Sequence, residues 1–153
     1  MIVVSDTSPL TALITIGWQE LLPRLFSEVV IPIGVRDELL RAHAVLPGWL
    51  RVEAVGDSDE AARLMMDLDR GEAEAIELAK ELHADRLLID ERKGRLVAVR
   101  EGVSVIGLLG VLLLAKRRGM IASARALLDR LELEAGIYLA ADLKEEALRS
   151  VGE

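Results

Sequence analysis

Acidic residues follow two short apolar segments of this 153-residue chain. Asp6 comes directly after the segment 2–5, and Asp90, with Glu91 beside it, follows the segment 86–89. Short runs of Val, Ile and Leu are typical of strands that are buried on both faces of a parallel sheet. Because ligands of open parallel sheets bind at the carboxyl ends of the strands, these acids are predicted to lie at a ligand-binding edge.

Two predicted helices each place a further carboxylate near their first turns. Glu38 lies beside the apolar face of the segment 34–42. Glu72 opens a segment in which apolar residues recur at helical spacing over 75–82, and it is predicted to face inward with them. The other carboxylates of this helix are predicted to face solvent: Glu74, Glu77 and Glu81.

If the two strands are neighbours, the four carboxylates meet at one edge of the sheet: Asp6, Glu38, Glu72 and Asp90. Carboxylates this close repel one another, so at least one must take a proton unless a cation compensates. Hard divalent cations accept all-oxygen ligand sets, and Mg²⁺ typically keeps several of its waters. Such a site orients and deprotonates water and neutralises a phosphoryl oxygen, which are the requirements of phosphodiester hydrolysis.

Each of these residues also has a purely structural interpretation. Asp6 and Asp90 are placed where helix N-caps or loop residues occur. Glu38 is also compatible with a solvated helix residue, and Glu72 with a charge that stabilises a helix N-terminus. Glu91 is compatible with the rim of a site. The joint pattern therefore favours a site more than any single member does.

The composition narrows the chemistry. The chain has no Cys, which excludes disulfides, thiolate metal sites and a Cys nucleophile. His43 and His83 fall near predicted helix ends and are expected to be structural or on the surface. The net charge of −7 argues against a polyanionic partner, but bound divalent cations would offset it. Cationic side chains are also clustered: Arg92, Lys93, Arg95, Arg100, Lys116, Arg117 and Arg118.

Strands alternate with helices along the chain, which predicts one α/β domain over 1–153 with a mainly parallel sheet and helices on both faces. Thr7 or Ser8 is expected to cap a helix that begins at Pro9, and residues 137–140 are expected to be a strand or an extended segment. No apolar run approaches the roughly 18 to 20 residues of a membrane span, and no secretion signal is recognisable. We therefore expect a cytoplasmic protein without membrane contact.

Five stretches carry a family resemblance, and together they span nearly the whole chain: 4–10, 30–39, 71–76, 88–95 and 107–116. By their order and intervals the chain resembles PIN-domain proteins, the superfamily of the VapC-type toxin ribonucleases, and in particular its subgroup of uncharacterised prokaryotic PIN-like proteins. The resemblance implies a three-layer α/β/α fold and Mg²⁺- or Mn²⁺-dependent cleavage of single-stranded RNA. It also implies a small antitoxin protein as a possible partner, and we expect a homodimer.

The resemblance also assigns roles to residues. The catalytic positions that it implies are Asp6, Glu38, Glu72 and Asp90. Metal would be held by Asp6, Glu72 and Asp90, with Glu91 as the alternative to Asp90. Glu38 would complete the pocket or assist proton removal. Candidates for contacts with RNA are Ser8, Arg92, Arg95 and Lys116, although a solvated helix charge is the preferred interpretation of Lys116.

Two other functions remain open from the sequence. A PIN-like fold with a vestigial site would serve as an interaction module, and the apolar segment 107–115 would then be core or a dimer surface, with core preferred. An aspartyl-phosphate phosphotransfer domain also places Asp at a strand end. The phosphatase form of that chemistry expects a second Asp two residues after Asp6, where this chain has Ser8.

Overall fold

The computed structural model describes residues 1–153 and contains a five-stranded sheet in the order β3-β2-β1-β4-β5. Every neighbouring pair of strands is parallel. The strands are β1 (Ile2–Ser5), β2 (Glu28–Ile31), β3 (Leu50–Val52), β4 (Arg86–Leu88) and β5 (Val105–Ile106). The prediction of an α/β protein with a mainly parallel sheet is confirmed.

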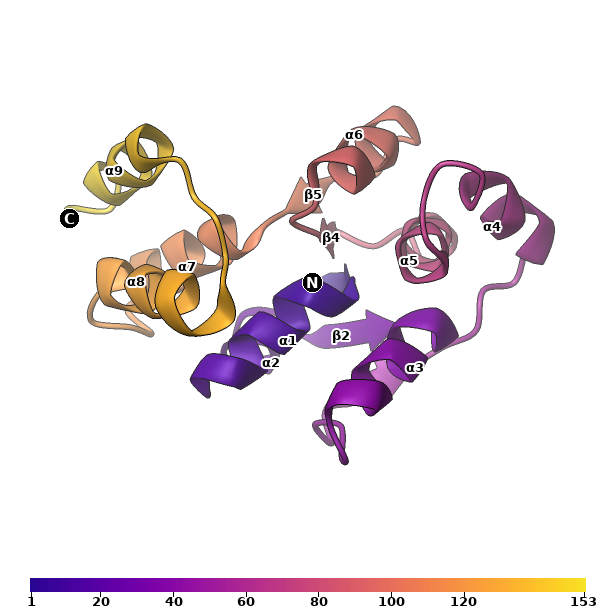
Figure 1. Ribbon diagram of the computed structural model, residues 1–153, viewed down its shortest axis with the longest axis horizontal. Coiled ribbons are helices and arrows are strands. Elements are labelled where there is room, and N and C mark those ends of the chain that lie inside the picture. The colour runs from indigo at the N-terminus through magenta and orange to yellow at the C-terminus, as the bar shows by residue number, and fades with distance from the viewer.

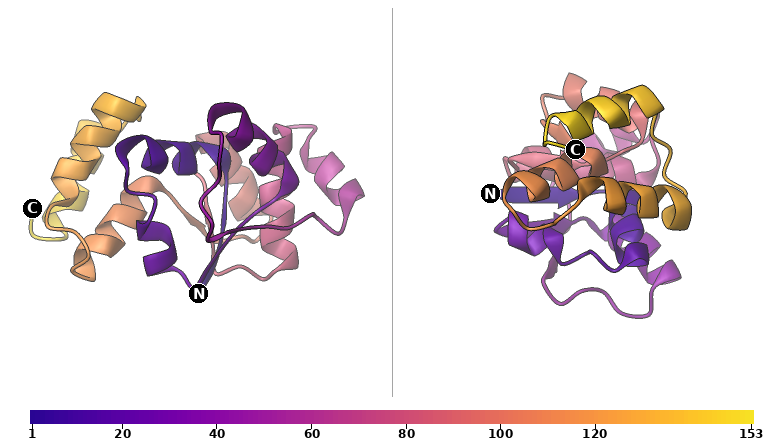
Figure 2. Two further views of the ribbon diagram at one scale, coloured as in Figure 1. Left: turned by 90° about the horizontal axis from the view of Figure 1, so that it is seen from below. Right: turned by 90° about the vertical axis from the view of Figure 1, so that its left-hand side faces the viewer.

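Helices connect the strands and cover both faces of the sheet (Figures 1 and 2). They are α1 (Thr7–Ile16), α2 (Leu21–Leu25), α3 (Ile33–Ala42), α4 (Ser58–Leu64), α5 (Arg70–Glu81), α6 (Arg92–Arg100), α7 (Leu108–Arg117), α8 (Ala124–Ala135) and α9 (Ala141–Arg149). The last three gather at one end of the molecule in Figure 1, away from α4, α5 and α6.

The alternation of side chains along the strands builds two hydrophobic cores, one on each face of the sheet. Val3 of β1 packs in a core with apolar residues of α1, α2, α7 and α8. Val4, the next residue, packs in a second core with residues of α4, α5 and α6. The three-layer α/β/α arrangement follows directly from this division.

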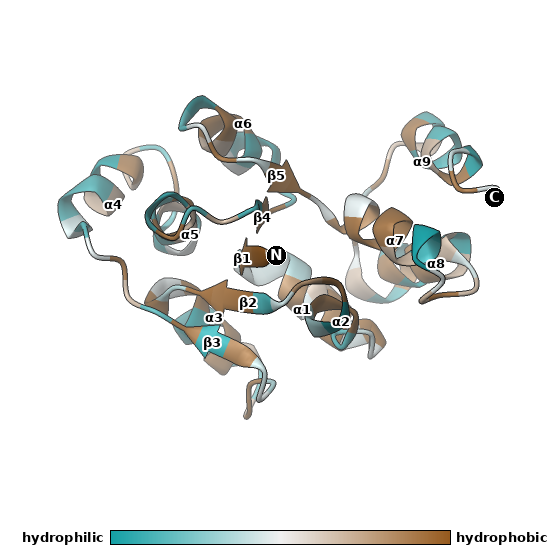
Figure 3. Ribbon diagram, turned by 180° about the vertical axis from the view of Figure 1, so that it is seen from behind, coloured by the Kyte–Doolittle hydropathy of each residue, from teal (hydrophilic) through white to brown (hydrophobic).

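Apolar residues make up most of β1, β2, β5 and α7, which are largely brown in Figure 3. On α7, Leu108, Val111, Leu112 and Ala115 are buried, so one face of this apolar helix belongs to the core. None of the helices combines the length and the apolar character that crossing a bilayer requires.

The strand order reverses beside β1, and this reversal creates the site. From β1 the chain continues to β2 and β3 on one side, and it later returns to place β4 and β5 on the other. Ser5 is in register with Leu88, and the Asp6 amide donates to the Leu88 carbonyl at 2.9 Å. Asp6 and Asp90 therefore leave adjacent strands at the same edge, where parallel α/β sheets bind their ligands.

The start of α1 differs from the prediction. The helix begins at Thr7, and Asp6, not Thr7 or Ser8, occupies the N-cap position with an extended backbone. The Asp6 side chain makes no capping hydrogen bond within the helix. Asp6 is the single residue between β1 and α1, so the residue that follows the strand is also the cap. Residues 137–140 form neither a helix nor a strand, so the alternative of a strand there is wrong; they connect α8 to α9.

The prediction that Glu74 and Glu77 face solvent is wrong. Only 7% of Glu74 and 3% of Glu77 is exposed, whereas Glu72 is half-buried. The reason is that α5 packs against α3, α4 and the sheet, so it has little free surface. Glu74 accepts hydrogen bonds from the Gly34 amide at 2.8 Å and from Arg70 at 2.9 Å, and Glu77 pairs with Lys80.

Candidate active site

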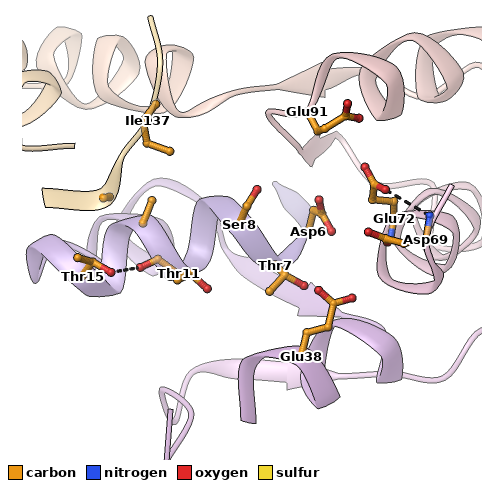
Figure 4. Close-up of a pocket in the computed structure, with 12 residues that line it drawn as sticks. Asp6, Thr7, Ser8, Thr11, Thr15, Glu38, Asp69, Glu72, Glu91 and Ile137 are labelled. Atoms are coloured by element: carbon orange, nitrogen blue, oxygen red, sulfur yellow. Dashed lines mark hydrogen bonds between the residues drawn. The ribbon is translucent and has the colours of Figure 1, made fainter. Parts of the chain in front are cut away.

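A cavity of about 480 Å³ lies at the carboxyl ends of the strands and extends along one face of α1 (Figure 4). Its acidic end is formed by carboxylates from two helices, α3 and α5, and from the N-cap positions of α1, α5 and α6. Its other end is formed by hydroxyl-bearing residues of α1 and by the segment after α8. The lining residues are Asp6, Thr7, Ser8, Thr11, Ala12, Thr15, Glu38, Asp69, Glu72, Glu91, Ala135 and Ile137.

Asp6 is the most deeply placed of the acids in the cavity, with 6% of its surface exposed. Burial raises the pKa of its carboxyl to about 7, although the nearby Thr7 backbone amide opposes the rise. Negative charges nearby raise the pKa further: Asp69, Glu38 and Asp90. Without a cation, this carboxyl therefore holds a proton over part of the neutral range.

Glu38 reaches the cavity from α3, and a glycine of α5 makes room for it. A Cβ at Gly71 would lie 2.5 Å from Glu38 Oε1, which is closer than atoms can pack. Glycine at this position therefore lets α3 and α5 approach closely enough for the Glu38 carboxylate to reach the acidic end. In Figure 4, Glu38 points toward Thr7 and the Asp6 side of the cavity.

Glu72 has a structural hydrogen bond as well as a place in the cavity. Asp69 caps α5 by accepting from the Glu72 amide at 2.8 Å, and Glu72 accepts from the Asp69 amide at 3.4 Å, which is a capping box. The pKa of Glu72 is raised by burial and then by the charges of Asp69 and Asp6. The second bond is long, and the carboxylate lies beside the other acids of the pocket.

Asp90 lines only the neighbouring cavity, whereas Glu91 lines both cavities. Asp90 lines a larger, mostly apolar neighbouring hollow, and its Oδ1 accepts from the Leu108 amide at the start of α7, 3.1 Å away. Its Oδ2 is buried without a hydrogen-bond partner, and burial raises its pKa, against a hydrogen bond from Leu108 and the charge of Arg95. Glu91 lines the acidic cavity and caps α6 by accepting from the Gly94 amide at 2.8 Å.

The structure brings only some of the candidate RNA-contacting residues to the site. Ser8 is exposed and lines both cavities. Arg95 lines the apolar hollow and donates to the Ile89 carbonyl at 3.0 Å, beside Asp90. Arg92 is exposed on the first turn of α6. Lys116 lies at the far end of α7, about 12 Å along the helix from Leu108, where it donates to the Ala122 carbonyl and pairs with Glu153.

Three polar residues of the cavity were not predicted as site residues: Asp69, Thr11 and Thr15. A signal for Asp69 was present, because an Asp followed three residues later by Glu72 is the pattern of a capping box. The two threonines follow Thr7 at intervals of four residues, which places all three on one face of a helix. This spacing becomes informative only once Asp6 is known to lie at the end of the same helix.

The donor atoms of the site fit a hard divalent cation. No group of three or more acidic or His side chains converges closely enough to enclose a metal ion directly. All donors are oxygens, however, and Thr7 Oγ1 and Asp90 Oδ2 are both buried without partners. Mg²⁺ commonly binds through one or two carboxylates and keeps its waters, so a cation in the cavity needs only Asp6 and one or two neighbours as direct ligands.

The fold and the site define a three-layer α/β/α protein with an acidic cavity at the switch point of its sheet. The DUF3368 family model, described as a PIN domain, matches residues 2–153, so the chain belongs to the PIN-domain family. PIN domains are generally nucleases, and PIN nucleases typically use divalent metals. Among curated proteins and solved structures, none is significantly similar to this chain.

Proposed function

We propose that this protein is a Mg²⁺- or Mn²⁺-dependent endoribonuclease that cleaves single-stranded RNA. One observation carries the proposal: carboxylates from β1, α3, α5 and the loop after β4 are gathered at the switch point of the sheet, where burial raises the pKa values of Asp6 and Asp90. Such a cluster is unfavourable when fully ionised, and a divalent cation relieves the repulsion. Membership of the PIN-domain family supports the same chemistry.

In this proposal the residues have distinct roles. Asp6 and Asp90 hold the cation from adjacent strand ends, with Glu72 acting directly or through water. Glu38, on the opposite wall, accepts a proton from the attacking water or orients it. The cation, when bound, supplies Lewis-acid stabilisation of the phosphate and a lower pKa for the water nucleophile. Attack in line with the leaving group yields 5′-phosphate and 3′-hydroxyl ends.

A catalytically vestigial PIN-like module is the second candidate, and specific contacts favour it. Glu72 and Glu91 both accept hydrogen bonds from backbone amides at helix N-termini, so each has a structural reason to be present. These bonds do not account for Asp6, whose carboxylate makes no capping bond within α1 and is buried among other acids. A buried acid at that position destabilises the metal-free fold, and a bound cation would compensate for this cost.

Cleavage of an unstructured RNA in Mn²⁺ tests the proposal. Asp6→Asn and Glu72→Gln remove a charge with almost no change in shape, and each is expected to reduce the cleavage rate by at least about 100-fold. Asp67→Asn is the matched control, because Asp67 is exposed and makes no side-chain hydrogen bond or ion pair. Cleavage by the Asp6→Asn variant at the wild-type rate, or cleavage by the wild-type protein in EDTA, contradicts the proposed metal-dependent mechanism. An absence of both cleavage and Mn²⁺ binding favours the vestigial module.

A role as the toxin of a toxin–antitoxin pair, acting in the cytoplasm as a homodimer, is part of the same proposal and is supported by the family resemblance. Induced expression is then expected to arrest bacterial growth, and Asp6→Asn is expected to relieve the arrest. If a small protein is encoded immediately upstream, its co-expression is expected to neutralise the active form. Growth that is unaffected by an active ribonuclease argues against the toxin role but leaves the chemistry in place.

A further inference from the structure

The cavity continues beyond its acidic end as a neutral groove along α1. Thr7, Thr11 and Thr15 follow one another at intervals of four residues, so their side chains lie about 6 Å apart along one face of the helix. Figure 4 shows this row leading away from Asp6 toward Ile137. Ala135 and Ile137 close the opposite side of the groove.

The hydroxyl groups of this row are available to a ligand. Thr7 Oγ1 is buried at the acidic end without a partner, and Thr11 Oγ1 makes no hydrogen bond within the protein. Thr15 donates to the Thr11 carbonyl at 2.8 Å, which leaves the lone pairs of its hydroxyl oxygen free to accept. Buried hydroxyls normally find a partner, so the unpaired Thr7 Oγ1 indicates a place for a polar group of a ligand. Thr11 is half-buried and Thr15 is exposed, so a ligand in the groove can reach their hydroxyls as well.

The charge of the groove indicates which part of a nucleic acid lies there. No Lys or Arg lines it, and its acidic end repels anions, so it does not suit a row of phosphates. A threonine side chain presents a hydroxyl beside a methyl group, which matches the mixed polar and apolar surface of a ribose. Hydroxyls also donate to and accept from the 2′-hydroxyl, the group that distinguishes RNA from DNA.

Building on the proposed nuclease function, we propose that Thr11 and Thr15 bind ribose 2′-hydroxyls next to the scissile phosphate and make the enzyme selective for RNA over DNA. Asp6 and Thr15 are separated by about 13 Å along α1, which is long enough for a few nucleotides. Thr7 lies at the acidic end, and in this proposal its hydroxyl contacts the cation or its waters and not the ribose. The selectivity is therefore a property of the α1 face and not of the carboxylates.

Binding of two strands of the same unstructured sequence, one RNA and one DNA, tests the inference. The Asp6→Asn protein in EDTA keeps both strands uncut, and fluorescence anisotropy of a labelled strand gives the two Kd values. RNA is expected to bind at least about tenfold more tightly than DNA, because one or two hydrogen bonds are lost in the DNA complex. Thr11→Val, which keeps the shape and removes the hydroxyl, is expected to reduce this ratio about fivefold, and Thr11→Ser is expected to retain it.

The controls separate this inference from the proposed function. Ser104→Ala removes an exposed hydroxyl outside the groove and is expected to leave the ratio unchanged. Wild-type protein is assayed in parallel for Mn²⁺-dependent cleavage of both strands. If RNA is cleaved but DNA binds equally well, or if Thr11→Val and Thr15→Val leave the ratio unaltered, the ribose contact is overturned while the nuclease stands. If neither strand binds nor is cleaved, the proposed function fails and this inference fails with it.

Discussion

Asp6 has both a structural position, between β1 and α1, and a buried carboxyl that is unfavourable when ionised. Its backbone joins β1 to α1, and its carboxyl is buried among other acids at a pKa of about 7. The sequence predicted its place correctly, because an acid after an apolar strand must lie at the sheet edge. The sequence could not predict its protonation, because the pKa depends on burial and on Glu38, Asp69 and Asp90, which only folding brings near.

The raised pKa of Asp6 makes the metal-free protein sensitive to pH. The unfolded carboxyl loses its proton near pH 3.8 and the folded one near pH 7, so folding favours the protonated form between these values. The free energy of unfolding therefore falls as pH rises through this window, by up to about 4 kcal/mol for this group. Above pH 7 the full loss is present, and below pH 3.8 there is none.

Asp6→Asn removes this titration and gives the corresponding test. In EDTA at pH 8 the variant is expected to be more stable than wild type, with a Tm higher by at least about 5 °C. Near pH 4 the two proteins are expected to melt at similar temperatures, and Asp67→Asn is expected to follow wild type throughout. Thermal unfolding monitored by circular dichroism measures all three. An Asp6→Asn protein that is less stable at pH 8 would show that the carboxylate serves the fold and not a ligand.

At the scale of the helices, sequence reasoning failed where one element is covered on several sides. A period of 3.6 residues identifies one apolar stripe, and it assigned the remaining carboxylates of α5 to solvent. In the structure α3 and α4 also cover this helix, so Glu74 and Glu77 are buried. Glu74 accepts hydrogen bonds from the Gly34 amide and Arg70, and Glu77 pairs with Lys80. This outcome strengthens the choice of Glu72, because Glu74 is fully engaged in joining α5 to α3.

The close contact between α3 and α5 allows Glu38 to be displaced without being changed. Gly71→Ala introduces a methyl group that meets Glu38 Oε1 at 2.5 Å, and the flexible end of Glu38 is the atom that must move. The α5 helix itself should gain slightly from alanine. We therefore expect the cleavage rate to fall about tenfold or more, with the Tm unchanged or slightly higher.

Gly48→Ala is the matched control for this substitution, since an added Cβ there has no neighbour within 4 Å. It is expected to cleave RNA as wild type does. Glu38→Gln is expected to reproduce the loss of rate seen with Gly71→Ala. If Gly71→Ala cleaves normally while Glu38→Gln does not, the position of the Glu38 carboxylate is less important to the reaction than its charge.

At the scale of the whole molecule, the order of the strands determines where chemistry takes place. The reversal between β1 and β4 places the ends of two strands side by side, and α3 and α5 complete the walls of the cavity. The sequence indicated the parallel sheet, the two acidic strand ends and the PIN-domain family. It could not indicate that Asp90 lines only the neighbouring hollow while Glu91 lines both cavities, or that Thr11 and Thr15 share a groove with Asp6.

A crystal soaked in Mn²⁺ near pH 8, measured for anomalous scattering, tests the central claim most directly. We expect one strong peak in the acidic cavity, within about 2 to 2.5 Å of an Asp6 oxygen or bridged to it by water, and no peak there in Asp6→Asn crystals. The remaining acids, with Asp90 foremost, are expected to turn toward the peak. A wild-type crystal at saturating Mn²⁺ with no peak between the strand ends would contradict the account.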